Sequence, residues 1–173
     1  MKRTIIVFAL SLFFLSFTSH TILAKETPVP SPEVQASASP TATPVNYLLP
    51  YPGILPDNAL YPLKMLRDKI MDIFTTDPVH KTDFLILMAD KRLAAGKALI
   101  EGNKIDLGQT TLFKGENYLS RAVDESALAI KQGKNINGTL DNLKNSSQKH
   151  IEILNGLLMK VPDQAKPGIQ KAY

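Results

Sequence analysis

The 173-residue chain contains no cysteine, no tryptophan and only three histidines. Without cysteine, the protein forms no disulfide, offers no thiolate to a metal and has no N-terminal cysteine to carry a lipid. Aromatic residues make up 7% of the chain, and its formal net charge is only +4. Stability must therefore come mainly from the burial of aliphatic side chains in one core.

The sequence also lacks the motifs of common enzyme classes. It contains no glycine-rich phosphate loop, no serine nucleophile elbow and no pair of helical carboxylates at metal-ligand spacing. In a helical bundle, His80 and His150 would lie about 18 Å apart along the axis, at about 1.5 Å per residue, which is too far to share a metal. We therefore expect no catalytic residue, no cofactor and no metal, and we interpret His150 as a hydrogen-bonded structural residue.

The N-terminal segment has the order of a secretory signal. Lys2 and Arg3 precede an apolar run at residues 5–17, and the small residue Ala24 follows. We predict that residues 1–24 are a signal peptide that is cleaved after export, with retention as a membrane anchor as the alternative. Cleavage would remove two basic residues and no acid, so the net charge of +4 would fall to +2. A chain so close to neutral does not indicate nucleic acid as a partner.

Two proline-rich stretches of different composition follow the signal. Residues 25–46 contain five prolines among Ser, Thr and Ala, which predicts a disordered linker. In residues 47–61, prolines alternate instead with leucine and tyrosine. In a free linker so much apolar surface would stay exposed to water, so we predict a structural collar that lies on the domain formed by residues 47–173. The alternative is a polyproline-like ligand or groove for a partner.

Apolar residues at helical spacing predict four helices, at about residues 62–74, 78–102, 104–132 and 136–161. Connections of two or three residues force neighbouring helices to run antiparallel. The fold prediction is therefore an all-α, up-down antiparallel bundle of about four helices, followed by at most one short helical piece. The residues expected to face the core in the first and third helices are Leu63, Leu66, Ile70, Ile73 and Phe74, and Ile105, Leu112, Leu119, Val123 and Ile130.

Charged residues interrupt the predicted apolar faces of two helices. Arg92 lies opposite a polar stripe that we expect to be solvated and that includes Asp90, and Glu116 lies within the apolar stripe of the third helix. Folding about the turn at Gly102 brings Arg92 within about one helical turn of Glu116. We predict an ion pair that fixes the register of the two helices, because a charge on a core face needs a partner.

The same residues could instead form a site for a small anionic ligand. Folding the first helix back places Tyr61 level with Arg92, and Asp57 of the collar lies nearby in sequence. The candidate ligand or ion-pair site therefore comprises Arg92, Glu116, Tyr61 and Asp57. Arg67, at the border of its helix's apolar stripe, is a weaker candidate.

Several segments resemble a known family. They read "LPDNALYPLKMLRDKI", "ADKRLAAGKALIEG", "TTLFKGENYLSRA" and "VPDQAKPGIQKA". Together, over roughly residues 50–172, they are similar to an exported bacterial family of unknown function, domain of unknown function 5667. The resemblance implies a helical extracytoplasmic domain and no catalytic residues. Gly96 and Gly115 depart from the pattern, because helical segments of this type more usually have alanine there.

These observations lead to one expected function and one alternative. We expect a non-catalytic, exported helical module that contacts a protein partner in the cell envelope. The alternative is an extracytoplasmic binding protein for a small anionic ligand. Contact with the membrane is expected only if residues 1–24 are retained as an anchor.

Overall fold

The structure is a computed structural model, and it describes residues 45–173. The predicted signal peptide at residues 1–24 and all but the last two residues of the predicted linker lie outside this part. The described residues form α1 (Tyr61–Phe74), α2 (Pro78–Glu101), α3 (Ile105–Lys131), α4 (Asn137–Lys160), the 3-10 turn η1 (Asp163–Ala165) and α5 (Lys166–Gln170). Residues 45–173 contain no strand, and the helices begin and end within two residues of the predicted bounds. The all-α prediction is confirmed.

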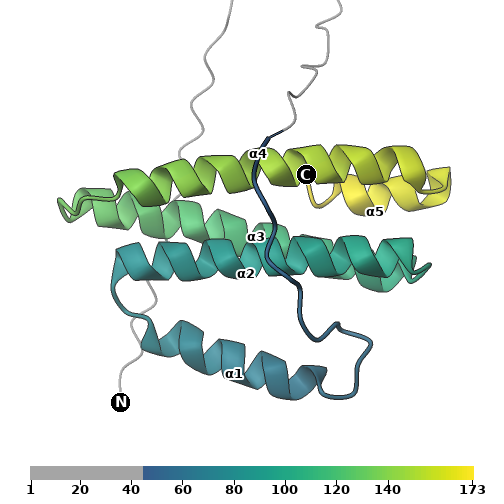
Figure 1. Ribbon diagram of the computed structural model, residues 1–173, viewed down its shortest axis with the longest axis horizontal. Helices are drawn as coiled ribbons and strands as arrows, with labels where there is room; N and C mark the ends of the chain where they lie inside the picture. Colours follow the sequence, from purple (N-terminus) through teal and green to yellow (C-terminus); the bar gives the residue numbers. More distant parts are fainter. Residues whose placement is uncertain (1–44) are drawn as a thin grey trace, which may run out of the picture. The chain divides into compact units, whose positions relative to one another are not determined.

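Helices α2, α3 and α4 run side by side in alternating directions and form the bundle (Figure 1). The short α5 folds back against α3 and α4. Helix α1 lies along α2 on the side away from α4, and residues 45–60 cross the bundle before they reach it (Figure 1). Within the described residues, no helix is both long enough and apolar enough to cross a bilayer.

Local signals set the bounds of α2 as predicted. The side chain of Asp77 accepts hydrogen bonds from the backbone N–H groups of Val79 (2.9 Å) and His80 (3.1 Å). Pro78 occupies the first helical position, where its missing N–H costs nothing. At the other end, the turn between α2 and α3 places Asn103 at a φ of 62°. Asparagine tolerates this left-handed conformation better than most residues.

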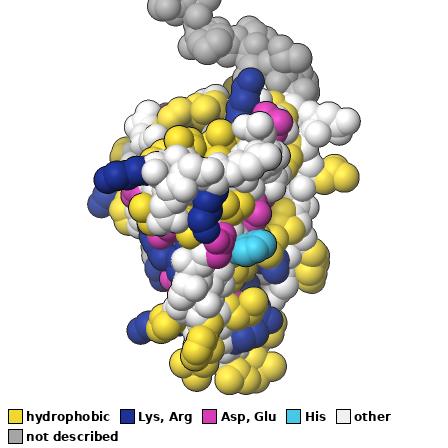
Figure 2. All heavy atoms as spheres, turned by 90° about the vertical axis from the view of Figure 1, so that its left-hand side faces the viewer, with side chains coloured by type: hydrophobic (Ala, Val, Ile, Leu, Met, Phe, Trp, Pro, Cys, Tyr) yellow, Lys and Arg dark blue, Asp and Glu magenta, His cyan; other side chains and the backbone are white. Residues whose placement is uncertain are grey.

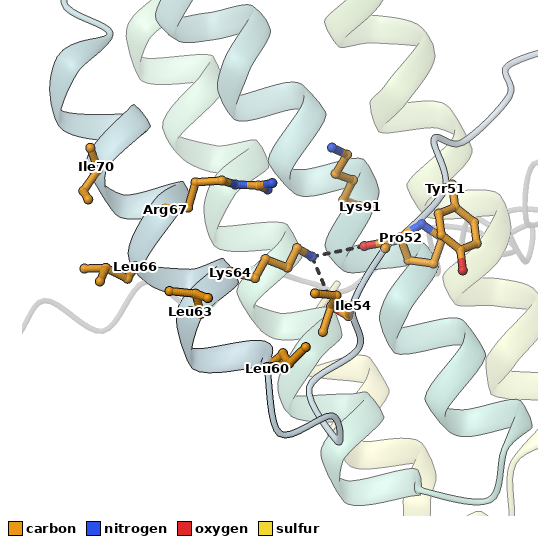
Figure 3. Close-up of a pocket in the computed structure, with 11 residues that line it drawn as sticks. Tyr51, Pro52, Ile54, Leu60, Leu63, Lys64, Leu66, Arg67, Ile70 and Lys91 are labelled. Carbon is orange, nitrogen blue, oxygen red and sulfur yellow. Dashed lines mark hydrogen bonds between the residues drawn. The ribbon is translucent and has the colours of Figure 1, made fainter.

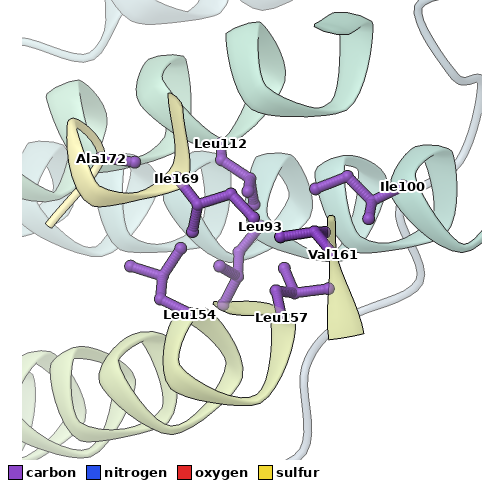
Figure 4. Packing of buried hydrophobic residues seen from close by; sticks show 8 residues of the cluster. All are labelled: Leu93, Ile100, Leu112, Leu154, Leu157, Val161, Ile169 and Ala172. Atoms are coloured by element: carbon purple, nitrogen blue, oxygen red, sulfur yellow. The ribbon is translucent and has the colours of Figure 1, made fainter. Parts of the chain in front are cut away.

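The apolar core lies between α2, α3, α4 and the C-terminal segment. One cluster gathers at the end of the bundle where α5 packs (Figure 4). It consists of Leu93, Ile100, Leu112, Leu154, Leu157, Val161, Ile169 and Ala172. A second cluster, nearer the other end of α2, contains Leu85, Ile86, Ala122 and Leu143. Helices α2, α3 and α4 each contribute to both clusters, and α2 is the central helix because it packs against α3 and α4 more extensively than those two pack against each other.

Helix α3 buries a face of small residues, which the prediction partly missed. Leu112 is buried as expected, but Val123 is 51% exposed and Ile130 is 54% exposed. Their neighbours Ala122 and Ala129 are buried instead. The expectation that Val123 and Ile130 face the core is wrong, because the buried side of α3 passes through Ala122 and Ala129, one position earlier in each turn.

Glycines bring the backbones of α2 and α3 together. A Cβ atom at Gly108 would lie 2.9 Å from the backbone oxygen of Gly96, and one at Gly96 would lie 2.6 Å from Leu112 Cδ2. A Cβ atom at Gly115 would lie 3.2 Å from Arg92 Cβ. These glycines therefore belong to the packing, and alanine at Gly96 or Gly108 would push the two helices apart.

We predict that Gly108→Ala lowers the free energy of unfolding by about 1–3 kcal/mol, because a backbone oxygen cannot move aside and the helices must separate. The matched control is Gly156→Ala in α4, where an added Cβ meets nothing within 4 Å. That change should raise the free energy of unfolding by up to about 1 kcal/mol through helix propensity. Urea denaturation of both variants gives the measurement. A Gly108→Ala protein as stable as the Gly156→Ala protein would contradict the close contact.

Candidate functional site

Helix α1 turns its apolar side to solvent. Its residues Leu63, Leu66, Ile70, Ile73 and Phe74 were expected to face the core, but their exposed fractions range from 46% to 80%. Leu60 and Met71 are exposed beside them. We call these residues the α1 face: Leu60, Leu63, Leu66, Ile70, Met71, Ile73 and Phe74. The predicted orientation of this helix is therefore wrong.

Polar side chains hold α1 in this orientation. Lys64, Asp68 and Asp72 follow one another at intervals of four residues, so they share one side of the helix. Lys64 and Asp68 are buried against the bundle, and Asp72 is half-buried. We call this contact the polar seam; it comprises Lys64, Asp68 and Asp72 together with the cations of α2 and α3 that pair with the two aspartates, which are Lys81, Arg92 and Arg121.

Lys64 ties the first turn of α1 to the collar. Its Nζ donates hydrogen bonds to the backbone oxygens of Pro52 (3.1 Å) and Ile54 (3.4 Å), as Figure 3 shows. Burial, together with the nearby charge of Arg92, lowers the pKa of Lys64. The collar therefore supplies backbone acceptors to a lysine that lies on the inner side of the helix.

Arg92 and Asp68 form the centre of the polar seam. Their side chains are each 1% exposed, and Arg92 Nη2 lies 3.5 Å from Asp68 Oδ2. The other carboxylate oxygen, Asp68 Oδ1, accepts a hydrogen bond from Arg67 at 2.7 Å. The guanidinium of Arg92 lies over the rings of Tyr61 (5.6 Å) and Tyr118 (5.8 Å), which favours a desolvated cation. Arg92 is thus neutralised inside the contact between α1 and the bundle.

Asp72 completes the polar seam near the end of α1. It forms ion pairs with Lys81 of α2 (2.6 Å) and Arg121 of α3 (3.0 Å). Burial raises the pKa of Asp72, but the hydrogen bonds from the two cations outweigh this effect and lower it overall. The carboxylate therefore stays charged and joins α1 to two helices at once.

A hollow of about 700 Å³ borders the α1 face (Figure 3). Its walls come from α1, the collar and Lys91 of α2. Apolar side chains from the collar and α1, including Ile54, Leu63 and Ile70, line most of it. In the space-filling view, hydrophobic side chains gather at the lower end of the molecule, where α1 lies (Figure 2). The site is therefore an open apolar surface next to a shallow hollow.

The structure brings together only part of the predicted site. Tyr61 lies beside Arg92 as its register predicted. Asp57 instead forms an ion pair with Lys104, and Glu116 forms a hydrogen bond with His150. The predicted ion pair between Arg92 and Glu116 is wrong. Its physical reason is the orientation of α1, which supplies Asp68 to Arg92 and leaves Glu116 to face α4.

A second polar cluster lies inside the bundle around His150. His150 Nδ1 lies 2.7 Å from Glu116 Oε1, and Nε2 lies 3.1 Å from Asp90 Oδ1. Ser146 and Tyr47 donate hydrogen bonds to Asp90, each at 2.6 Å. The structural interpretation of His150 is confirmed, whereas Asp90 is buried and not part of a solvated stripe. We call these five residues the His150 cluster.

The His150 cluster shifts the pKa values of two of its members. Burial lowers the pKa of His150, but the hydrogen bonds to Asp90 and Glu116 outweigh burial and raise it overall. Burial and the hydrogen bond to Asp90 raise the pKa of the Tyr47 phenol well above its usual range. Because Tyr47 belongs to the collar, the cluster joins the collar to α2, α3 and α4.

The described part of the chain offers little geometric support for a small-ligand site or a metal site. A hollow of about 150 Å³ beside Arg92 is lined by Lys114 and Arg121, but the Arg92 guanidinium is already paired with Asp68. No group of three His, Asp or Glu side chains within residues 45–173 could hold a metal ion. The polar residues that the structure gathers therefore connect helices to one another.

Comparison with known proteins gives one match. The model of a family described as "Domain of unknown function (DUF5667)" matches residues 53–164. This range extends from within the collar into η1, and it includes the residues of the polar seam and every member of the His150 cluster except Tyr47. No curated protein and no solved structure matches the chain.

We predict that Arg92 and Asp68 are energetically coupled and that Arg92 and Glu116 are not. Removing one member of a buried ion pair costs on the order of 3–5 kcal/mol, because its partner stays buried without a counter-charge. Two double-mutant cycles test this: Arg92→Met with Asp68→Leu, and Arg92→Met with Glu116→Leu. Coupling should exceed about 0.5 kcal/mol only in the first cycle. Coupling confined to the second cycle would support the ion pair that the sequence suggested.

We predict that the protein loses stability as the pH rises above the unfolded-state pKa of histidine, about 6.5. The folded state holds the His150 proton more tightly than the unfolded state, because the pKa of His150 is raised on folding. The resulting stabilisation is complete below about pH 6.5 and disappears as the pH passes the raised value. Urea denaturation at several pH values from about 6 to 9 measures it. His150→Gln should flatten the profile, and an equally steep profile in that variant would contradict the assignment.

Proposed function

Since the chain belongs to the DUF5667 family, whose description assigns no activity, we propose that it is a non-catalytic, exported helical module that docks in the cell envelope through the α1 face. The charged, apolar and small-residue order of residues 1–24 supports export. The helical bundle then serves as a rigid platform, and α1 is the part of it that makes contact.

One observation carries this proposal: an amphipathic helix is bound to its own domain by its polar side. Seven large apolar side chains of the α1 face are exposed, while Lys64 and Asp68 are buried. Contiguous apolar patches of this kind on a soluble domain commonly mark interaction sites. The polar seam prevents α1 from turning over, because such a rotation would leave Arg92 buried without its carboxylate.

A binding site for a small anion has weaker support from the same geometry. Arg92 is the residue expected to hold such a ligand, but its side chain is 1% exposed and lies 3.5 Å from Asp68. The rings of Tyr61 and Tyr118 flank its guanidinium. The α1 face needs no rearrangement to make contact, whereas Arg92 would have to give up its present partners.

The absence of cysteine permits a direct test of docking. Leu66→Cys places a single thiol on the α1 face, and Val123→Cys places one on α3 at a similar exposure, 51% against 56% for Leu66. Each full-length variant is labelled with a membrane-impermeant maleimide on cells of the producing host and again after purification. We expect the thiol of Leu66→Cys to react several-fold more slowly on cells than in purified protein, and that of Val123→Cys to react equally in both.

The two variants separate export from docking. Export predicts that the thiol of Val123→Cys reacts with the impermeant reagent on cells. Docking predicts that only the thiol of Leu66→Cys is shielded there. If the Leu66→Cys protein reacts as fast on cells as after purification, the α1 face is free and the docking proposal is wrong.

A further inference from the structure

We propose that the α1 face binds the surface of a lipid bilayer that contains anionic lipids. This inference rests on the docking function proposed above and names its partner. It also changes an earlier expectation, because the contact would not require residues 1–24 to be retained as an anchor.

The shape and composition of the α1 face suit the interfacial region of a bilayer. Helix α1 is 14 residues long, and its exposed side carries leucine, isoleucine, methionine and phenylalanine along its whole length. Helices with such a continuous apolar side lie in the plane of a membrane and insert that side about 5–10 Å into the headgroup and acyl boundary. Ordinarily the polar side of such a helix faces water, but here it is bound to the bundle. The domain would therefore sit on the membrane with α1 between the two.

Exposed charges around the α1 face are basic. At 100° per residue, Lys69 lies at one border of the apolar arc, and Arg67 lies within the arc between Phe74 and Leu60. Both are exposed, although Arg67 also donates a hydrogen bond to Asp68. Lys91 of α2 borders the adjoining hollow. The acidic residues of α1, Asp68 and Asp72, point into the polar seam. Long basic side chains at the border of an apolar surface can keep their stems in the apolar layer and extend their charges to phosphate groups.

The same charges disfavour a second copy of this chain as the occupant. A symmetric dimer brings the same patch of two molecules together. The interface would then contain Lys69 and Lys91 of both copies, and α1 would offer no exposed acid to compensate. Like charges brought together in this way cost affinity. An anionic lipid surface supplies the opposite charge, and its fluid apolar layer needs no matching shape.

Vesicle co-sedimentation tests this inference with a chain that begins at Lys25. Such a chain retains every contact described here, because all of them lie within residues 45–173, and it lacks the N-terminal apolar run that would itself bind lipid. Vesicles of phosphatidylcholine are compared with vesicles that also contain phosphatidylglycerol. We expect clear sedimentation with the phosphatidylglycerol vesicles at low salt, and weak sedimentation with phosphatidylcholine alone.

Two pairs of substitutions separate the apolar and the electrostatic contributions. Leu63→Gln with Ile70→Gln removes two exposed apolar side chains and should weaken binding to both kinds of vesicle at least about tenfold. Lys69→Gln with Lys91→Gln should weaken binding to the phosphatidylglycerol vesicles by up to about 30-fold, at about one kcal/mol per basic residue near the surface, and should leave binding to phosphatidylcholine unchanged.

The matched control is Val123→Gln with Ile130→Gln on α3. These residues have the same spacing of seven as Leu63 and Ile70 and are similarly exposed. The control protein should bind both kinds of vesicle as the parent chain does. Thermal unfolding followed by circular dichroism confirms that each variant is folded.

Three outcomes would overturn the inference. The first is a parent chain that does not sediment with the phosphatidylglycerol vesicles. The second is undiminished binding by the Leu63→Gln, Ile70→Gln variant. The third is a parent chain that forms a dimer in sedimentation equilibrium while this variant is a monomer, which would assign the α1 face to a second copy. If the parent chain fails to bind vesicles while the Leu66→Cys thiol remains shielded on cells, the lipid inference is wrong and the docking function stands.

Discussion

The ion pair between Asp68 and Arg92 controls the orientation of α1, and the interaction surface depends on that orientation. Both side chains are almost fully buried, and a buried charge requires a partner. One turn before Asp68, Lys64 donates hydrogen bonds to the collar, and one turn after it, Asp72 pairs with cations of α2 and α3. Helix α1 could bury its apolar side only by abandoning this whole set of contacts. The charged residues inside the contact therefore keep the apolar residues outside it.

The two polar clusters have different structural consequences. The His150 cluster lies within the bundle and holds the collar to α2, α3 and α4 through Tyr47 and Asp90. The polar seam lies at the edge and holds α1 to α2 and α3. Lys64 connects the collar with α1 by its hydrogen bonds to Pro52 and Ile54. The prolines of the collar lower the entropy lost when this irregular segment is held in place.

The bundle has the properties of a platform for the α1 face. Close contact through Gly96 and Gly108 packs α2 against α3, and the apolar clusters join both helices to α4 and α5. Helix α1 packs on the outside of this unit through side chains of α2 and α3, of which Arg92 is fully buried. A surface carried in this way can meet a partner without rearrangement of the fold, which limits the entropy that binding costs.

Local chemistry in the sequence determined the helices, their order and their ends. Asp77 and Pro78 mark the start of α2, because the Asp77 side chain accepts hydrogen bonds from free backbone N–H groups and Pro78 has no N–H to satisfy. Short connections make neighbouring helices antiparallel. The register of the first turn even placed Tyr61 beside Arg92. Only the tertiary structure decided which side of α1 is buried and which acid pairs with Arg92. It also decided that the side chains of Asp90 and Ala122 are buried and that of Val123 is exposed. Helical periodicity identifies two sides of a helix but not the neighbour that each side meets. In α1 that neighbour offers a buried arginine, so electrostatic pairing outweighs the burial of apolar side chains.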